Sequence, residues 1–301
     1  MRFLANAIMR GPLAAILVVS AAALLGLLLP PLGYISAAAV ALVMLRLGAA
    51  ESGKVVAGSV LATALLGALA LGNPWLALFF LLALWLPIWV LAWTLRVSAN
   101  LAGSFKRAAL FGALLVLGMH LVVDDPAAWW TSVLQPLLEQ APAEQQQMLL
   151  PVLGEVARLM TGMIGAMTAL GLIVSLLLAR AWQASLYNPG GLRQEFYALR
   201  MGHSLAGVTV ALLVAAWALA DQAQILADLL PLALMLHLLQ GLALVHALVA
   251  QRKANGAWLV ALYVLLLLPM LMVQLAILLA AVGWLDTWLD LRTRWGSSPS
   301  E

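Results

Sequence analysis

Apolar residues occur along the chain in runs about as long as a lipid bilayer is thick, separated by short polar segments. A helix needs about 20 mostly apolar residues to cross the hydrocarbon core. The runs that approach or exceed this length cover residues 12–30, 33–47, 55–72, 75–95, 108–123, 151–179, 204–220, 229–250 and 257–282. The pattern predicts an all-α, polytopic transmembrane bundle forming a single integral membrane domain. It has about nine spans, or eight if the short second run does not cross.

Two segments between these runs are too polar to span. Residues 126–150 contain Leu134, Leu137 and Leu138 at helical spacing after a Trp129–Trp130 pair. An amphipathic pattern of this kind is typical of a helix that lies in the membrane interface. Residues 180–203 form a loop on the opposite side in the alternation of spans. We therefore expect an outer interfacial segment at 126–150 and an inner loop at 180–203.

Composition agrees with a lipid environment. Of the 301 residues, 65% are hydrophobic and 9% are charged, whereas about a quarter of the residues in ordinary soluble domains are charged. A soluble fold of this composition would expose very large apolar patches. The chain has no cysteine, which excludes disulfides, thiolate nucleophiles and cysteine-ligated metals. We expect the lipid bilayer as surroundings, and neither a cofactor nor a metal.

The basic residues give the expected orientation, because Lys and Arg are enriched in cytoplasmic loops. A cytoplasmic N-terminus leaves Arg158, Arg292 and Arg294 outside, and places Asp124, Asp125, Asp221 and Asp228 outside as well. It puts 12 of the 15 basic residues inside, namely Arg2, Arg10, Arg46, Lys54, Arg96, Lys106, Arg107, Arg180, Arg193, Arg200, Arg252 and Lys253. We therefore expect a multi-pass protein of the bacterial inner membrane, whose C-terminus lies in the periplasm if there are nine spans. The basic residues lie in separate loops and not on one face, which argues against nucleic acid as a partner.

The inner loop is the most distinctive polar stretch. Its Asn-Pro-Gly-Gly sequence is a strong turn signal, since Pro fixes one φ angle and Gly permits positive φ. The loop could be a tight turn followed by an interfacial helix whose arginines meet anionic lipid. Alternatively, it could dock a cytoplasmic or membrane protein. The candidate docking residues are Tyr187, Asn188, Pro189, Gly190, Gly191, Arg193, Glu195 and Arg200.

The same loop carries a family resemblance. The string Leu186 to Gly191, followed by Glu195-Phe196 and Leu199-Arg200, resembles the YybS-like family of bacterial multi-pass membrane proteins of unknown function. That family is distantly similar to the S-components of energy-coupling-factor transporters. The resemblance implies recognition of a small solute inside a helical bundle, and it allows a partner that uses ATP.

Polar side chains inside spans are costly in lipid and are functional candidates by default. His237 and Gln240 lie one turn apart, and Gln274 lies in the last run at a similar predicted depth of about 12 Å. His237 and Gln274 could therefore meet across a helix pair. They could line a path for a solute or a proton, or they could be interhelical hydrogen bonds that only hold the bundle together.

Other candidates for lining a solute site lie nearer the N-terminus. His120 precedes Asp124 by one turn at the end of its run, where it could be a gate, a pH sensor or an ordinary interface histidine. Trp85 and Trp89 are one turn apart beside Pro87. They could stack a flat ligand or simply pack against a neighbouring helix or lipid.

Sequence motifs for catalysis are lacking. The chain contains no Walker A loop, H-E-x-x-H motif or G-x-G-x-x-G motif, and its acidic residues fall almost entirely in predicted loops. We therefore expect no catalytic residues and no enzyme activity. Two hypotheses remain: an S-component-like protein that binds or moves a small solute, or a membrane scaffold that recruits a partner through residues 180–203.

Overall fold

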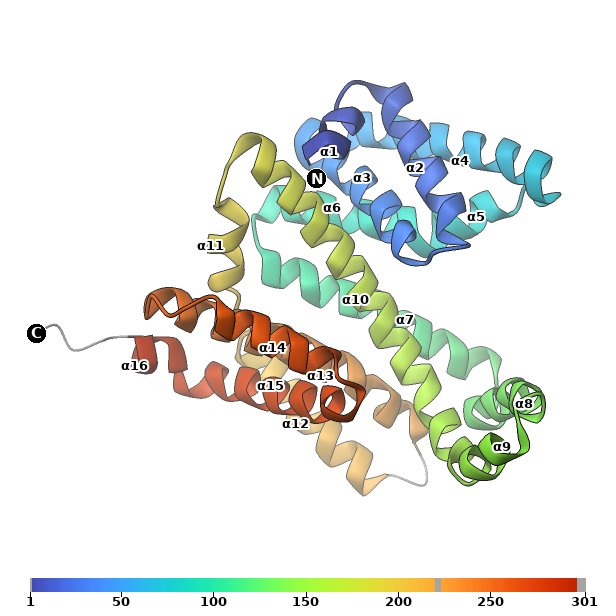
Figure 1. The fold of residues 1–301 in the computed structure, drawn as a ribbon, viewed down its shortest axis with the longest axis vertical. Helices are drawn as coiled ribbons and strands as arrows, with labels where there is room; N and C mark the ends of the chain where they lie inside the picture. The colour runs from blue at the N-terminus through green and yellow to red at the C-terminus, as the bar shows by residue number, and fades with distance from the viewer. Residues whose placement is uncertain (1, 220–222, 297–301) are drawn as a thin grey trace, which may run out of the picture. The chain divides into compact units, whose positions relative to one another are not determined.

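The computed structural model describes residues 2–219 and 223–296, and these residues form helices and connecting turns without any strand (Figure 1). The prediction of an all-α protein is confirmed. The chain divides into two compact units. Unit 1 comprises residues 1–108 and 170–199, and unit 2 comprises residues 109–169 and 200–301. Helices α7 (Leu101–Val122) and α10 (Leu153–Tyr187) contribute one part to each unit.

Unit 1 is built around α3, in which every residue from Ser36 to Leu45 is buried. Helices α2, α4 and α6 pack around it. The indole Nε1 of Trp85 donates to Ser36 Oγ over 2.9 Å, which anchors the helix carrying Trp85 to α3. The complete helices of this unit are α1 (Arg2–Ile8), α2 (Pro12–Gly26), α3 (Pro31–Leu47), α4 (Ala49–Leu71), α5 (Leu76–Phe80), the π-helical turn η1 (Leu81–Trp85), α6 (Leu86–Ser98) and α11 (Gly191–Tyr197).

Unit 2 is built around α13, which packs against α12 and α15. The α13 and α15 backbones almost touch: a Cβ added at Gly241 would lie 2.0 Å from the Leu279 carbonyl oxygen, and one at Gly283 would lie 2.1 Å from that of His237. The complete helices of this unit are α8 (Pro126–Glu139), α9 (Ala143–Leu149), the 3-10 turn η2 (Leu150–Val152), α12 (His203–Ala218), α13 (Gln224–Gln251), α14 (Ala257–Leu267), α15 (Pro269–Leu289) and α16 (Leu291–Gly296).

Several of these helices are suited to a membrane. Within the described residues, six helices are long and apolar enough to cross a bilayer: Ala49–Leu71, Leu76–Ser98, Leu101–Val122, Ala143–Tyr187, Gln224–Gln251 and Pro269–Leu289. Shorter apolar helices are Pro12–Gly26, Pro31–Leu47, His203–Ala218 and Ala257–Leu267. The segment predicted at 126–150 is helical, as α8 and α9. The end of the predicted span 204–220 and the predicted outer residue Asp221 lie outside the described residues.

The run 257–282 is not the single helix that we predicted. It is split at Leu268, whose φ and ψ of −80° and 115° are extended, between α14 and α15. The cause is Pro269, which disfavours helical geometry in the residue before it and is itself well placed at the first position of a new helix. Figure 1 shows α14 and α15 running side by side in opposite directions.

This break reverses the direction of the last long helix. Arg200, just before α12, forms a 2.6 Å ion pair with Asp290, just after α15. Arg252, just after α13, donates through two nitrogens to the Trp295 carbonyl oxygen at 3.0 and 2.8 Å. The chain after α15 therefore returns to the end of unit 2 where α12 begins and α13 ends. Our prediction of the opposite end for Arg292 and Arg294 was wrong, because it counted α14 and α15 as one helix.

Candidate functional site

The candidate site of unit 2 is built on a close meeting of α7, α10 and α13. A Cβ added at Gly112 of α7 would lie 2.3 Å from the Gly165 carbonyl oxygen of α10. One added at Gly162 of α10 would lie 2.6 Å from the Asp228 carbonyl oxygen of α13. Because these glycines lack side chains, the α10 backbone comes close to the middle of α7 and to the beginning of α13.

This approach joins His120 of α7 to Asp228 of α13. The imidazole Nε2 lies 2.8 Å from the carboxylate Oδ2, and the two side chains are 15% and 2% exposed. Gln224, one turn before Asp228 on α13, lies near the second carboxylate oxygen at 3.5 Å. A proton on His120 Nε2 is thus donated to a carboxylate that is almost completely withdrawn from solvent.

His120 of this pair lines a polar hollow of about 760 Å³. The side chains that give its wall a polar character are those of His120, Asp124, Asp125, Thr131, Arg158 and Gln224. Helix α8 closes one side and is held to α10 by a 2.9 Å hydrogen bond from Trp130 Nε1 to Thr161 Oγ1. The volume is in the range of small-molecule sites.

The charge in and beside the hollow is predominantly acidic. Asp125 accepts the Ala128 backbone N–H over 2.9 Å and so caps α8. Arg158 is the basic residue of the wall, and Glu155, three residues earlier on the same helix, lies 3.8 Å from it. Because the nearby carboxylates outnumber the arginine, the electrostatic potential favours a solute that carries positive charge or N–H donors.

The predicted candidates His237 and Gln240 are buried by protein contacts. His237 is 1% exposed, and its Nε2 lies 2.9 Å from Thr209 Oγ1 of α12. Gln240 is completely buried; its amide oxygen accepts the Met201 backbone N–H over 2.9 Å, and its nitrogen donates to Thr287 over 3.1 Å. Gln274 is exposed on α15. The α15 residue against His237 is Gly283, nine residues further on, so His237 and Gln274 do not meet as we expected.

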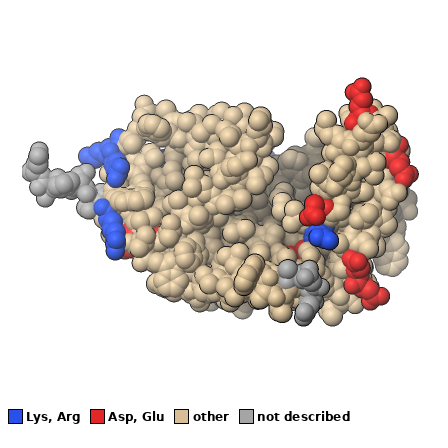
Figure 2. Space-filling view, turned by 90° about the horizontal axis from the view of Figure 1, so that it is seen from below, with Lys and Arg blue, Asp and Glu red and all other residues tan. Residues whose placement is uncertain are grey.

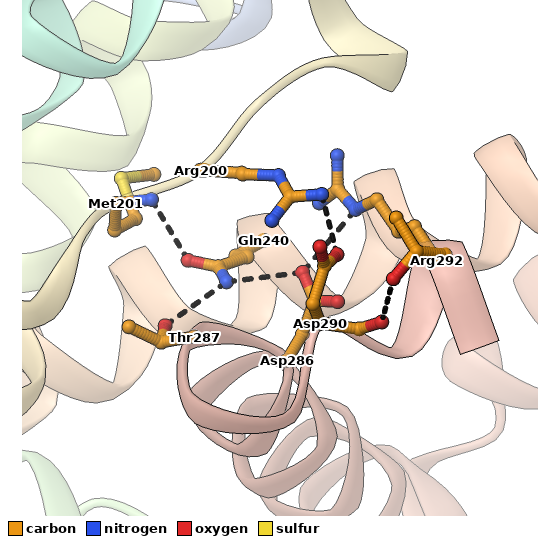
Figure 3. A network of polar contacts seen from close by, with 8 residues as sticks. Arg200, Met201, Gln240, Asp286, Thr287, Asp290 and Arg292 are labelled. Carbon is orange, nitrogen blue, oxygen red and sulfur yellow. Dashed lines mark hydrogen bonds and ion pairs between the residues drawn. The ribbon is translucent and has the colours of Figure 1, made fainter.

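Gln240 also belongs to a buried network that our prediction did not include (Figure 3). Its amide nitrogen lies 3.3 Å from Asp286 Oδ2, which also accepts from Arg292 Nε over 3.2 Å. The Asp286 and Arg292 side chains are 0% and 5% exposed. Burial lowers the pKa of Arg292, and the Asp286 carboxylate opposes this effect. The network ties the start of α12 to α13, α15 and α16, and its central carboxylate is fully buried, so we assign it to stability.

The predicted aromatic pair belongs to unit 1. Trp85 is fully buried against Ser36 and lies 5.9 Å from the Phe80 ring in a stacked arrangement. Trp89 is half-buried and lines an apolar groove between α4 and the α5–α6 segment, together with Gly53, Ala57 and Leu86. Trp85 is therefore a packing residue, and the two tryptophans do not face a common space.

The predicted docking loop is ordered in unit 1 by contacts on both sides of its turn. Arg180 of α10 pairs with Glu195 of α11, and the Arg46 guanidinium lies 4.1 Å from the centre of the Tyr187 ring. Gly190 adopts a positive φ of 90°, as the turn signal predicted. The loop places Asn188, Pro189 and Arg193 on the surface, leaves Gly191 half-buried, and ends at Arg200, which belongs to unit 2.

Sequence reasoning missed Asp228 and Asp286 as buried acids. Both lie just beyond the predicted spans, Asp228 one residue before the run 229–250 and Asp286 four residues after the run 257–282. The available signal was position on a helix face: Asp228 and Gln224 are one turn apart, as are Asp286 and Asp290. The chain matches no protein-family model, no curated protein and no solved structure.

Proposed function

We propose that this protein is a multi-pass protein of the bacterial inner membrane that binds a small, positively charged or amine-bearing solute in the hollow of unit 2. The observation that carries the proposal is the buried Asp228–His120 pair at the wall of that hollow. A buried carboxylate is expensive unless it is paired, and a site that keeps one beside a polar hollow is a candidate for ligand binding. An S-component-like role, implied by the resemblance to the YybS-like family, agrees with a solute site of this size.

A topology with both ends in the cytoplasm follows from the same proposal. The eight runs before residue 257 each cross once, and α14 and α15 enter and leave from one side. Arg292 and Arg294 then join the cytoplasmic basic residues, which strengthens the excess of Lys and Arg inside. Figure 2 shows this separation of charge on the face that it draws, with most Lys and Arg side chains at one end and most acidic side chains toward the opposite end. The hollow, near Asp124 and Asp125, would face the periplasm.

The solute site can be tested with purified protein in detergent. Millimolar putrescine or choline should raise the thermal unfolding temperature of the wild type, because a ligand that binds only the folded state stabilises it. Succinate should not. Asp228→Asn keeps the side-chain shape but removes the charge, and it should abolish the shift. Glu139→Gln removes one carboxylate from the exposed surface of α8, and this variant should retain the shift in unfolding temperature. A full shift in Asp228→Asn, or no shift with either amine in the wild type, would exclude the proposed site.

The second candidate function is recruitment of a protein partner by the loop after α10. It is favoured by the Arg180–Glu195 pair and the Arg46–Tyr187 contact, which hold an exposed turn in place. Replacing Gly190 with alanine would strain its positive φ. The sharper variant is therefore Asn188→Ala with Arg193→Ala, which changes surface chemistry alone. A partner that co-purifies with the wild type should be lost from this double variant, and its retention would count against docking.

A further inference from the structure

The end of unit 2 opposite the hollow collects basic side chains from three segments that are distant in sequence. We call it the basic end. The Arg200–Asp290 ion pair and the hydrogen bonds of Arg252 to the Trp295 carbonyl oxygen bring these segments together. The basic end comprises Arg200, Arg252, Lys253, Arg292 and Arg294, and Figure 2 shows Lys and Arg side chains gathered at one end of the face that it draws.

The acidic residues at the basic end neutralise part of this charge. Asp290 pairs with Arg200, and Asp286 pairs with Arg292. Arg252, Lys253 and Arg294 are exposed, and within the described residues none of the three takes part in an ion pair. Arg252 uses its Nε and one terminal nitrogen for the Trp295 carbonyl, which fixes the guanidinium while its other terminal nitrogen points elsewhere. Among the described residues, the basic end therefore presents three positive charges that no acidic side chain pairs with.

Aromatic residues surround these charges. Trp258 at the start of α14 is 70% exposed, and Trp288 and Trp295 are each 49% exposed. Trp288 also stacks edge-on against His203, with ring centres 5.1 Å apart, at the start of α12. Tryptophan is enriched where a membrane protein meets the lipid headgroups. The apolar helices α13 and α15 end here, so the basic end lies at headgroup level.

We propose that Arg252, Lys253 and Arg294 bind the phosphate of an anionic phospholipid. A lipid matches both halves of the surface, because its phosphate meets the uncompensated charges while its acyl chains cover the exposed side chains of α14. Free inorganic phosphate would satisfy only the charges. Basic groups between the cytoplasmic ends of helices are a known mode of anionic headgroup recognition. This site is independent of the solute hollow and requires only that the basic end meets a membrane surface.

The proposal is tested by lipid binding to the full-length protein in detergent, measured by native mass spectrometry. The probes are phosphatidylglycerol and phosphatidylcholine with identical acyl chains. The wild type should retain phosphatidylglycerol in preference to phosphatidylcholine, and added salt should weaken the preference. Each basic residue near a membrane surface contributes about fivefold to such binding. The Arg252→Gln, Lys253→Gln, Arg294→Gln triple variant should therefore bind phosphatidylglycerol on the order of a hundredfold more weakly.

Two further variants keep the result interpretable. Lys253→Gln with Arg294→Gln leaves the Arg252–Trp295 contacts intact, and it should weaken binding about 25-fold by the same rule. The triple variant Arg2→Gln, Arg10→Gln, Arg107→Gln removes the same charge from exposed positions of unit 1 and should bind like the wild type. Equal binding of both lipids by the wild type would overturn the proposal. So would full phosphatidylglycerol binding by the double variant, an equal loss in the unit 1 control, or displacement of the lipid by millimolar inorganic phosphate.

Discussion

Buried charged side chains in unit 2 are held in pairs. Asp228 meets His120, which lies 108 residues away in sequence, and Asp286 meets Arg292 six residues further along the chain. Removing one partner of a buried pair leaves an uncompensated charge and costs about 3–5 kcal/mol. The two pairs have different surroundings, since Asp228 adjoins a hollow while Asp286 is enclosed by Gln240 and Arg292. We therefore propose a ligand-binding role for the first pair and assign the second to packing.

The exposed Arg200–Asp290 pair makes a pH-dependent contribution to stability. The hydrogen bond from Arg200 lowers the pKa of Asp290 below its ordinary value of 3.8. A carboxylate whose pKa is lowered by folding stabilises the protein above that ordinary value, and the contribution is lost as the pH falls through the lowered pKa. Asp290→Asn should therefore unfold at a slightly lower temperature than the wild type at pH 6. The difference between the two proteins should shrink as the pH falls below 3.8, and a difference that does not shrink with falling pH would contradict this assignment.

At the level of single residues, sequence identified the groups more readily than their partners. His120, His237 and Gln240 were found because polar atoms are conspicuous in apolar runs. Their roles depend on contacts over long sequence distances, such as His120 with Asp228 and Gln240 with Met201. Hydropathy treats an acid near the end of a run as part of a loop, so Asp228 and Asp286 were assigned to water. The one-turn spacing of Asp228 from Gln224 and of Asp286 from Asp290 was a sign of a shared helix face, but it does not reveal which helix covers that face.

Glycine controls how closely the helices of unit 2 approach. Gly241 and Gly283 bring the α13 and α15 backbones into contact, and Gly112 and Gly162 do the same around α10. Small residues at spacing four, such as Gly162 and Ala166, are a recognisable sign of close packing in sequence. The helix against which each glycine packs cannot be recognised in the sequence, because many alanine-rich spans offer the same spacing.

A larger residue at Gly283 should separate α13 from α15. A Cβ there would lie 2.1 Å from the His237 carbonyl oxygen and 2.6 Å from the Gly241 nitrogen, and neither backbone group can move aside alone. Gly283→Val should lower the free energy of unfolding by several kcal/mol, in the range of severe overpacking. Ala281→Val, on the exposed face two residues earlier, should have little effect. Thermal unfolding in detergent would compare the two, and equal stability would contradict the close contact.

The general architecture of the molecule was predictable from its sequence, but the reversal of the chain between α14 and α15 was not. Runs of apolar residues predicted a helical membrane protein, and the described residues are helical with several membrane-length helices. The error came from Pro269, which lies within a continuous apolar run. An average of hydropathy over the run does not reveal this proline, but its steric effect on the backbone still breaks the helix. One break of this kind changes the side on which every later residue lies.

A topology reporter distinguishes an arrangement with the C-terminus in the cytoplasm from one with the C-terminus in the periplasm. A fusion after Glu301 should report the cytoplasm, because α15 returns to the end of unit 2 that carries Arg200 and Arg252. A matching fusion in the α8–α9 connection, after Gln140, should report the periplasm. A periplasmic signal from the first fusion would restore a single crossing between residues 257 and 282. Identical signals from both fusions would contradict the alternation of the preceding spans.

The break at Leu268 also constrains how the chain enters the membrane during synthesis. Helix α14 has 11 residues, or about 16 Å of helix against a hydrocarbon core of about 30 Å. Emerging alone from the ribosome, it is too short to be released into lipid as an independent span. It has to wait for α15 and partition with it as one hairpin. The insertion of α14 is therefore coupled to the completion of α15.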